Sequence, residues 1–221
     1  MRMLSVERRI WLREQASRYS DALDGNPDVS AYLLGELRGL EWSTVGGALL
    51  GVVTEPEAEH RNYVGRISIP YITPGGVVGL RFRCPGPAYD PDHKCEGHAK
   101  YLSVTGAPVG LYNVKALHDA GDVIGIAEGE FDALAATQAG LPTVGIPGVD
   151  TWKPHWYRLF EGFSEVIMLA DADDKKGEGM KLASVIQEEV DATRICAMPG
   201  GEDVSSFIVA KGPEEFMNWV R

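Results

Sequence analysis

Cysteine is scarce in this sequence, long apolar runs and repeats are absent, and each absence excludes a class of protein. Three cysteines in 221 residues are too few for a disulfide framework. No apolar run reaches the roughly 18 residues that a membrane span needs. The opening MRMLSVERRIWLREQ is charged and lacks the apolar core of a signal peptide. We therefore expect a soluble protein of the cytoplasm with no membrane partner.

The overall composition is that of a globular protein, but its charge is unevenly distributed. Hydrophobic residues make up 44% and charged residues 24% of the chain, which argues against disorder and against coiled coil. The net charge is -11, of which residues 121–221 contribute -10 and residues 1–120 only -1. Such asymmetry suits an acidic half that binds divalent cations and a more basic half that binds phosphate. An ordinary protein with an uneven surface would show the same asymmetry.

The first half of the chain predicts helices followed by short strands. Apolar residues at helical spacing predict a helix over 5–38, interrupted at Asn26-Pro27-Asp28 and ended by Gly39. Residues 66–71 and 77–83 predict a β-hairpin around a turn at 73–76, in which Arg81 and Arg83 alternate with Phe82. Residues 84–99 are polar and predict a loop.

The second half predicts a parallel sheet. Four apolar strands are expected at 123–127, 143–146, 166–170 and 194–197, and they alternate with helices at 131–139, 154–161, 177–190, 203–211 and 213–220. Strands that are apolar on both faces are typical of a parallel sheet covered on both sides. The fold class is therefore α/β, a doubly wound sheet over residues 121–221 preceded by a more basic α+β subdomain over residues 1–120.

Acidic residues follow two of these strands. Glu128 comes directly after the first strand, and Asp171 and Asp173 come after the third. The carboxyl ends of parallel strands meet at one sheet edge, so the three carboxylates should converge. Asp132 lies one helical turn beyond Glu128 and can face the same cleft.

Closely packed carboxylates repel one another, and a divalent cation removes that repulsion. Oxygen ligands on short side chains suit Mg²⁺, which can hold a phosphate for in-line displacement. The alternative is that acids at helix starts cap the helix and interact with its dipole. That alternative is stronger for Asp132 or Asp174 alone, and we expect Glu130 to be a solvated surface acid.

The pair of segments AEGEFDAL and ADADDKKG resembles the Toprim domain, whose pattern is a Glu after one strand and Asp-x-Asp after a later one. Upstream and downstream segments are similar to the catalytic core of DnaG-type bacterial primases. The resemblance covers most of residues 28–212, and its segments are Tyr32–Leu34 with Arg38–Leu40, Gly65–Pro70, Gly79–Arg83, Lys100–Ser103, Leu111–Asn113 and Met198–Asp203.

The resemblance implies a Toprim-type fold and Mg²⁺-dependent synthesis of short RNA primers from ribonucleoside triphosphates on single-stranded DNA, with Mn²⁺ able to substitute. It implies that Glu128, Asp171 and Asp173 are catalytic metal ligands. It also implies that Asp132 and Asp203 bind a second metal ion or orient the residues that bind the first. It also implies that four basic residues bind phosphates of the template or of the nucleotide, namely Arg66, Arg81, Arg83 and Lys100.

The resemblance further implies a compact core typical of phages, acting in the bacterial host cytoplasm. We expect no zinc-ribbon domain and no helicase-binding domain in the chain, so a separate zinc-ribbon protein or a replicative helicase would be its partner. Two alternatives stay open. One is a Toprim nuclease that uses the same metals, and the other is a non-catalytic DNA-binding replication module.

Four residues of the two types that bind zinc most often occur in the polar loop, namely Cys84, His93, Cys95 and His98. Their spacing fits no common zinc finger, so we expect loop residues with reduced thiols in preference to structural Zn²⁺. Tyr101 and Tyr112 could stack on bases, but packing is the more frequent role of such residues.

Overall fold

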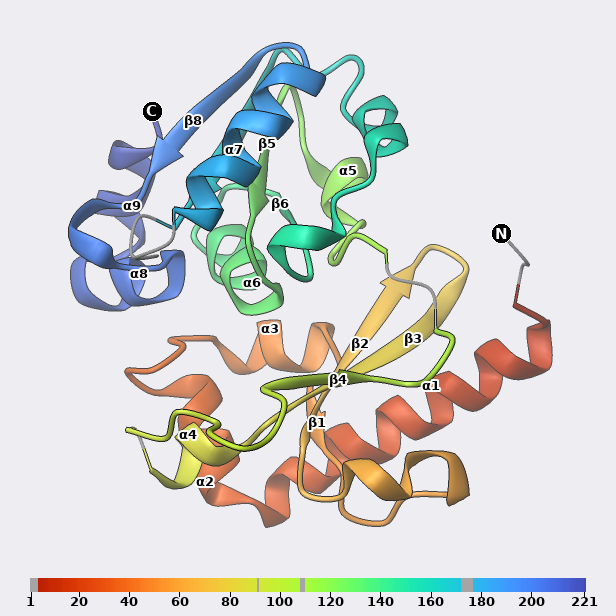
Figure 1. Cartoon of the computed structure of the whole chain (residues 1–221). Helices are drawn as coiled ribbons and strands as arrows, with labels where there is room; N and C mark the ends of the chain where they lie inside the picture. Colours follow the sequence, from red (N-terminus) through yellow and green to blue (C-terminus); the bar gives the residue numbers. More distant parts are fainter. Residues whose placement is uncertain (1–3, 91, 108–109, 172–176) are drawn as a thin grey trace. The chain divides into compact units, whose positions relative to one another are not determined.

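The computed structural model describes residues 4–90, 92–107, 110–171 and 177–221 (Figure 1). The chain divides into two compact units, one of residues 1–35 and 40–108 and the other of residues 36–39 and 109–221. None of the helices in the described ranges is long and apolar enough to cross a membrane.

The first unit begins with helices that break where the sequence predicts. Helix α1 (Val6–Asp21) starts at Ser5, whose hydroxyl accepts a hydrogen bond from the Arg8 N–H, and α2 (Pro27–Leu34) has proline in its first turn. The predicted end at Gly39 is wrong, because α2 already ends at Gly35, which is extended. The other short helices are η1 (Ala22–Gly25), α3 (Trp42–Gly47), η2 (Ala58–Tyr63) and α4 (Gly86–Tyr89).

An antiparallel sheet with the strand order β1-β2-β3-β4 forms the rest of this unit. The predicted hairpin is confirmed, with Arg81 of β3 opposite Ile69 of β2 and a register shift between Tyr71 and Ile72. Phe82 is fully buried in the core beneath α1. The strands are β1 (Gly51–Val52), β2 (Ile67–Thr73), β3 (Gly76–Arg83) and β4 (Tyr101–Ser103).

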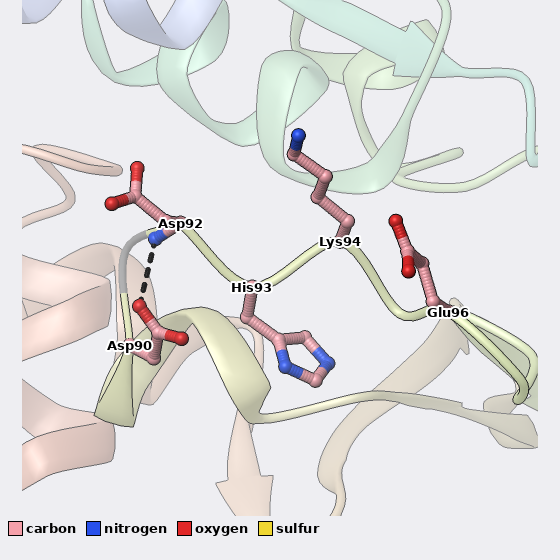
Figure 2. A pocket seen from close by; sticks show the side chains of 5 residues that line it. All are labelled: Asp90, Asp92, His93, Lys94 and Glu96. Atoms are coloured by element: carbon pink, nitrogen blue, oxygen red, sulfur yellow. Dashed lines mark hydrogen bonds between the residues drawn. The ribbon is translucent and has the colours of Figure 1, made fainter.

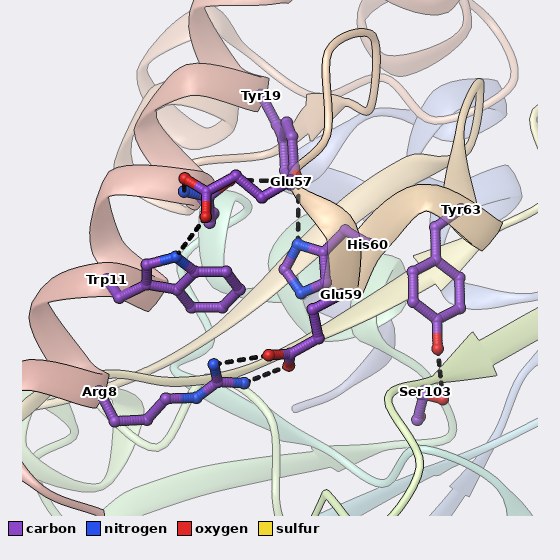
Figure 3. A network of polar contacts seen from close by, with 9 residues as sticks. Arg8, Trp11, Tyr19, Glu57, Glu59, His60, Tyr63 and Ser103 are labelled. Atoms are coloured by element: carbon purple, nitrogen blue, oxygen red, sulfur yellow. Dashed lines mark hydrogen bonds and ion pairs between the residues drawn. The ribbon is translucent and has the colours of Figure 1, made fainter.

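Beside this core a polar network joins α1 to η2 (Figure 3). Trp11 and Gln15 of α1 donate hydrogen bonds to Glu57, at 3.0 and 3.1 Å, and Arg8 binds both carboxylate oxygens of Glu59. The fully buried His60 lies with its Nδ1 2.9 Å from the Tyr19 hydroxyl. The other ring nitrogen of His60, Nε2, has no hydrogen-bond partner among the described residues.

The second unit is built on a parallel sheet with the strand order β6-β5-β7-β8, which confirms the expected α/β class. The strands are β5 (Val123–Ala127), β6 (Thr143–Gly145), β7 (Glu165–Ala170) and β8 (Thr193–Ala197). The helices are α5 (Ala116–Asp119), α6 (Glu130–Gln138), α7 (Glu178–Glu189), α8 (Val204–Lys211) and α9 (Pro213–Trp219).

Three further segments of this unit are 3-10 turns. They are η3 (Val149–Thr151), η4 (Pro154–Leu159) and η5 (Pro199–Gly201). The helix expected at 154–161 is therefore present as a 3-10 helix over Pro154–Leu159. Hydrogen bonds three residues apart, such as Phe160 N–H to Tyr157 C=O, tighten this segment.

Helices cover both faces of the parallel sheet. Val144 and Met168 pack on one face with Leu182 and Ile186 of α7. Gly145 faces the opposite side of the sheet from its neighbour Val144. A Cβ added at Gly145 would lie 3.2 Å from the Cβ of Ala133 in α6, so α6 covers that opposite face. This close packing of α6 fixes the loop between β5 and α6, where the first acidic residue lies.

Candidate metal and nucleotide site

Strands β5 and β7 are neighbours, and an acidic residue follows each of them. Ala127 pairs with Leu169 across the two strands, so Glu128 and Asp171 emerge at the same edge. The Asp171 N–H donates a hydrogen bond to Glu128 Oε1 at 3.2 Å. Both residues are half-buried. The structure therefore places the Glu128 carboxylate against the backbone of Asp171, so two of the three residues expected as metal ligands are in contact.

The first turn of α7 lies directly against this acidic pair. Gly177 precedes the helix with left-handed backbone (φ 65°), which favours glycine. A Cβ added at Gly179 would lie 2.4 Å from Glu128 Oε1 and 2.9 Å from the Asp171 carbonyl oxygen. Only glycine leaves room for the Glu128 carboxylate here, and the amino end of a helix is favourable for negative charge.

The third expected ligand, Asp173, lies outside the described residues, as does Asp174. Its place next to Asp171 therefore stays a prediction from the sequence. Oxygen donors alone make up the described part of the site, and such donors suit a hard cation such as Mg²⁺ and not a soft one.

The Asp132 carboxylate is hydrogen-bonded to the start of α8. Its Oδ1 accepts hydrogen bonds from the Ser205 N–H at 3.0 Å and from the Ser205 hydroxyl at 2.8 Å. Burial raises the pKa of Asp132, and the nearby Asp203 charge raises it further. Asp132 Oδ2 lies toward Gly129, 3.1 Å from the position of an added Cβ. Asp132 thus lies near the acidic pair in the chain but interacts with the end of another helix.

Asp203 caps the same helix. Its carboxylate accepts the Ser206 N–H at 2.7 Å, and the Ser206 hydroxyl lies 3.0 Å from the Asp203 N–H, completing a capping box. Arg38 Nη1 lies 3.7 Å from Asp203 Oδ2. Sequence reasoning did not assign Arg38 to the site, although its Arg-Gly-Leu segment was part of the resemblance. The cation also opposes the rise in the Asp132 pKa.

Glu130 is not a surface acid, and that expectation is wrong. Its exposed fraction is 1%, because the first turn of α6 follows β5 at once and is buried with it. Its charge adds to the burial that raises the pKa of Tyr112. Tyr112 itself is buried, and its backbone exchanges two hydrogen bonds with Gly145, so packing is its role in this unit.

The basic residues expected to bind phosphate lie in the first unit, and three of them surround Tyr101. The Arg81, Arg83 and Lys100 cations lie 4.3, 5.1 and 5.9 Å from the centre of the Tyr101 ring, and Arg83 also donates to the Tyr101 hydroxyl. Arg83 is buried, with an exposed fraction of 4%. The fourth, Arg66, donates to the Ala99 carbonyl at 3.0 Å.

The chain is similar in sequence to phage and bacterial proteins. The Gene 57 protein of Mycobacterium phage D29 is 36% identical over 160 residues, which are 70% of this chain and 97% of that protein. A DNA primase of Pseudomonas putida is 31% identical over 131 residues, 53% of this chain. The chain spans 20% of the length of that primase. No protein-family model matches the chain.

The fold is similar to that of a solved primase domain. The RNA polymerase domain of Mycobacterium tuberculosis primase DnaG, crystallised with a double-stranded DNA oligomer with a 6-nucleotide overhang, matches with a TM-score of 0.74 and 20% identity. The match covers 99% of this chain and 81% of that domain. The chain therefore belongs to one family with the phage Gene 57 protein, and its fold is that of the DnaG-type primase catalytic core.

Proposed function

We propose that the chain is a primase catalytic core that joins ribonucleotides into short RNA primers on a single-stranded DNA template. The observation that carries this proposal is the contact between Asp171 and Glu128 at the carboxyl edge of β5 and β7. In an α/β sheet this edge is where ligands bind. The similarity to a DNA-bound primase domain supports nucleic acid as the substrate.

Glu128, Asp171 and Asp173 would hold divalent metal, Mg²⁺ or Mn²⁺. The residues fit such an ion, since carboxylate oxygens are its preferred ligands and Gly179 leaves space beside Glu128. A bound ion would neutralise the triphosphate charge and favour the in-line attack of a 3′-hydroxyl. The Asp171 N–H orients Glu128, and the amino end of α7 adds positive potential.

Asp132 and Asp203 would act as positioning residues. Their hydrogen bonds to Ser205 and Ser206 fix the start of α8. Whether either also holds a second ion is decided by variants that keep the hydrogen bond and remove the charge. Arg38 balances this second acidic pair.

The residues around Tyr101 would bind phosphates of the template or of the nucleotide. Arg81, Arg83 and Lys100 bring three positive charges to one ring, and an aromatic ring holds such cations without neutralising them. The guanidinium fork of arginine suits phosphate oxygens. Arg66 would extend this surface from β2's amino end, where it precedes Ile67.

Ribonucleoside triphosphates are the proposed substrates, and the bacterial host cytoplasm is the proposed site of action. A replicative helicase or a separate zinc-ribbon protein would supply template recognition. These partners follow from the similarity to primases and need their own binding tests.

The test is oligoribonucleotide synthesis on single-stranded DNA with all four ribonucleotides. Glu128→Gln and Asp171→Asn should each lower the rate at least about 100-fold, because even outer-shell partners of a metal contribute about 10- to 100-fold. Glu188→Gln, an exposed carboxylate on α7, is the matched control and should keep full activity.

Two other results would replace the proposal. Shortening of labelled DNA in the presence of Mg²⁺, lost in both variants, would identify a nuclease that uses the same site. DNA binding that needs no Mg²⁺, without synthesis or cleavage under any condition, would identify a non-catalytic module.

A further inference from the structure

The loop of residues 84–100 between β3 and β4 is long and has almost no core of its own. Its ends are joined where the Cys84 N–H donates to the Lys100 carbonyl at 2.8 Å. Among its described residues only Cys84 is buried, and α4 is its one helix there. A loop of this length without a core needs another source of order.

Four potential metal ligands come together in this loop. One ligand atom from each of Cys84, His93, Cys95 and His98 lies within 4.8 Å of all the others. Cys84 Sγ lies 3.5 Å from His93 Nε2 and 3.0 Å from His98 Nε2. Bond lengths of about 2.3 Å for Zn–S and about 2.0 Å for Zn–N place sulfur and nitrogen roughly 3.5 Å apart across a tetrahedral ion. The observed separations agree with that arrangement to within about half an ångström.

The surrounding backbone is shaped to this cluster. The Gly86 N–H donates to Cys84 Sγ at 3.3 Å. A Cβ added at Gly86 would lie 2.1 Å from Cδ2 of the His93 ring, so glycine is needed for the ring to lie there. Cys95 has left-handed backbone (φ 53°), a conformation that costs energy in a residue other than glycine. These features bring four side chains together, although the first and the last of them, Cys84 and His98, are 14 residues apart in the sequence.

We propose that Cys84, His93, Cys95 and His98 bind a structural zinc ion. Two thiolates and two imidazoles form a donor set that selects zinc over hard cations. Four protein ligands leave no open coordination position, so the ion would act in structure and not in catalysis.

The acidic residues of the same loop are a separate feature. They border a surface hollow of about 370 Å³ lined by Asp90, Asp92, His93, Lys94 and Glu96, shown in Figure 2. The carboxylates are oxygen donors on exposed side chains, and only His93 belongs to both groups. The zinc ligands therefore do not depend on the hollow.

The ion would fix the residues at both ends of the loop. Cys84 directly follows Arg83, and His98 lies two residues before Lys100. Both cations lie near the Tyr101 ring. A zinc ion at the loop would thus hold in place the positive cluster, the three cations Arg81, Arg83 and Lys100 around the Tyr101 ring, whatever substrate that cluster binds.

The first test is the metal content of the full chain, purified under reducing conditions with its affinity tag removed. We expect about one zinc per chain, and replacement by Co²⁺ should give the visible absorption of a tetrahedral site with thiolate ligands. Cys84→Ser with Cys95→Ser should abolish both signals. Cys196→Ser, a buried cysteine of the second unit, is the matched control and should keep both.

The second readout is limited proteolysis at Lys94, which is exposed within the loop. A strong chelator should speed trypsin cleavage at Lys94 in the wild type, and added Zn²⁺ should reverse it. The double variant should be cleaved rapidly with or without chelator. Less than about a tenth of an equivalent of zinc after incubation with Zn²⁺ and dialysis, or a Cys84–Cys95 disulfide in the purified protein, would overturn the proposal.

Discussion

Gly179 lies in a helix, where alanine would ordinarily be better by about 1 kcal/mol. Here a Cβ would lie 2.4 Å from Glu128 Oε1, so the carboxylate would have to move by about 1 Å to reach an ordinary van der Waals separation of about 3.5 Å. A misplacement of that size can cost about 100-fold in rate. We therefore expect Gly179→Ala to lower primer synthesis about 100-fold while the protein stays folded.

The measurement is the rate of synthesis at increasing Mg²⁺ concentration, together with thermal unfolding. Ser184→Ala, an exposed position on the same helix, is the control and should match the wild type. Full activity of Gly179→Ala would show that the acidic pair is not a metal site.

His60 makes the stability of the first unit sensitive to pH. Burial lowers the pKa of His60 from its model-compound value of 6.5, although the charges of Glu59 and Glu57 oppose the change and Arg8 adds to it. Below about pH 6.5 the unfolded chain binds more protons at this residue than the folded chain does, until the pH falls below the lowered pKa of the folded state. The free energy of unfolding should therefore fall as the pH drops below about 6.5, and the effect should be absent above it.

Urea unfolding between about pH 5 and pH 8 measures this dependence. His60→Gln should unfold at lower urea concentration and should lose part of the pH dependence below pH 6.5. His118→Gln, at an exposed histidine, should keep the wild-type dependence. An identical pH dependence in His60→Gln and the wild type would contradict this account.

Among the elements, helix α8 depends on its cap at Asp203. The carboxylate accepts the Ser206 N–H at 2.7 Å, and loss of such a cap costs about 1 kcal/mol. Asp203→Ala should therefore lower the free energy of unfolding by about 1 kcal/mol. Asp203→Ser retains a capping hydroxyl and should lose only a few tenths.

Chemical denaturation of the two variants checks this prediction, and their activity tests the metal role. If Asp203 serves only as a cap, Asp203→Ser should synthesise primers at the wild-type rate. Equal stability of Asp203→Ala and the wild type would contradict the capping role.

Strands β3 and β4 present the positive cluster around Tyr101. Arg81 lies over the ring at 4.3 Å and is half-buried, whereas Arg83 is buried. If Arg81 contacts one phosphate, Arg81→Gln should weaken single-stranded DNA binding and should reduce the slope of log affinity against log salt by about 0.7. Fluorescence anisotropy at several salt concentrations measures this slope.

The control for this prediction is Arg158→Gln in the second unit, which carries an exposed arginine. It should leave the slope unchanged. An unchanged slope in Arg81→Gln as well would show that the Tyr101 cluster does not bind the nucleic-acid backbone.

At the scale of the whole molecule, strands were more predictable than helix types. The strand predicted at 123–127 matches β5, and β7 and β8 begin one residue earlier than predicted. Strands buried on both faces are continuous apolar runs, which the sequence shows directly. The η4 segment has the apolar spacing of an α-helix but the hydrogen bonds of a 3-10 turn, and spacing cannot distinguish the two.

The candidate site was predictable to the extent that it follows strands. Glu128 and Asp171 come after paired strands, so their contact could be expected from the sequence alone. The hydrogen bonds between Asp132 and Ser205 could not be predicted, because the two residues are 73 positions apart in the sequence. The meeting of Cys84 with His98 depends in the same way on the path of an irregular loop.

The most direct measurement is anomalous diffraction from crystals soaked in Mn²⁺, at a photon energy above the manganese edge and below the zinc edge. We expect a peak within about 2.5 Å of carboxylate oxygens of both Glu128 and Asp171. A well-occupied Mn²⁺ elsewhere in the protein, with no peak at this pair, would contradict it.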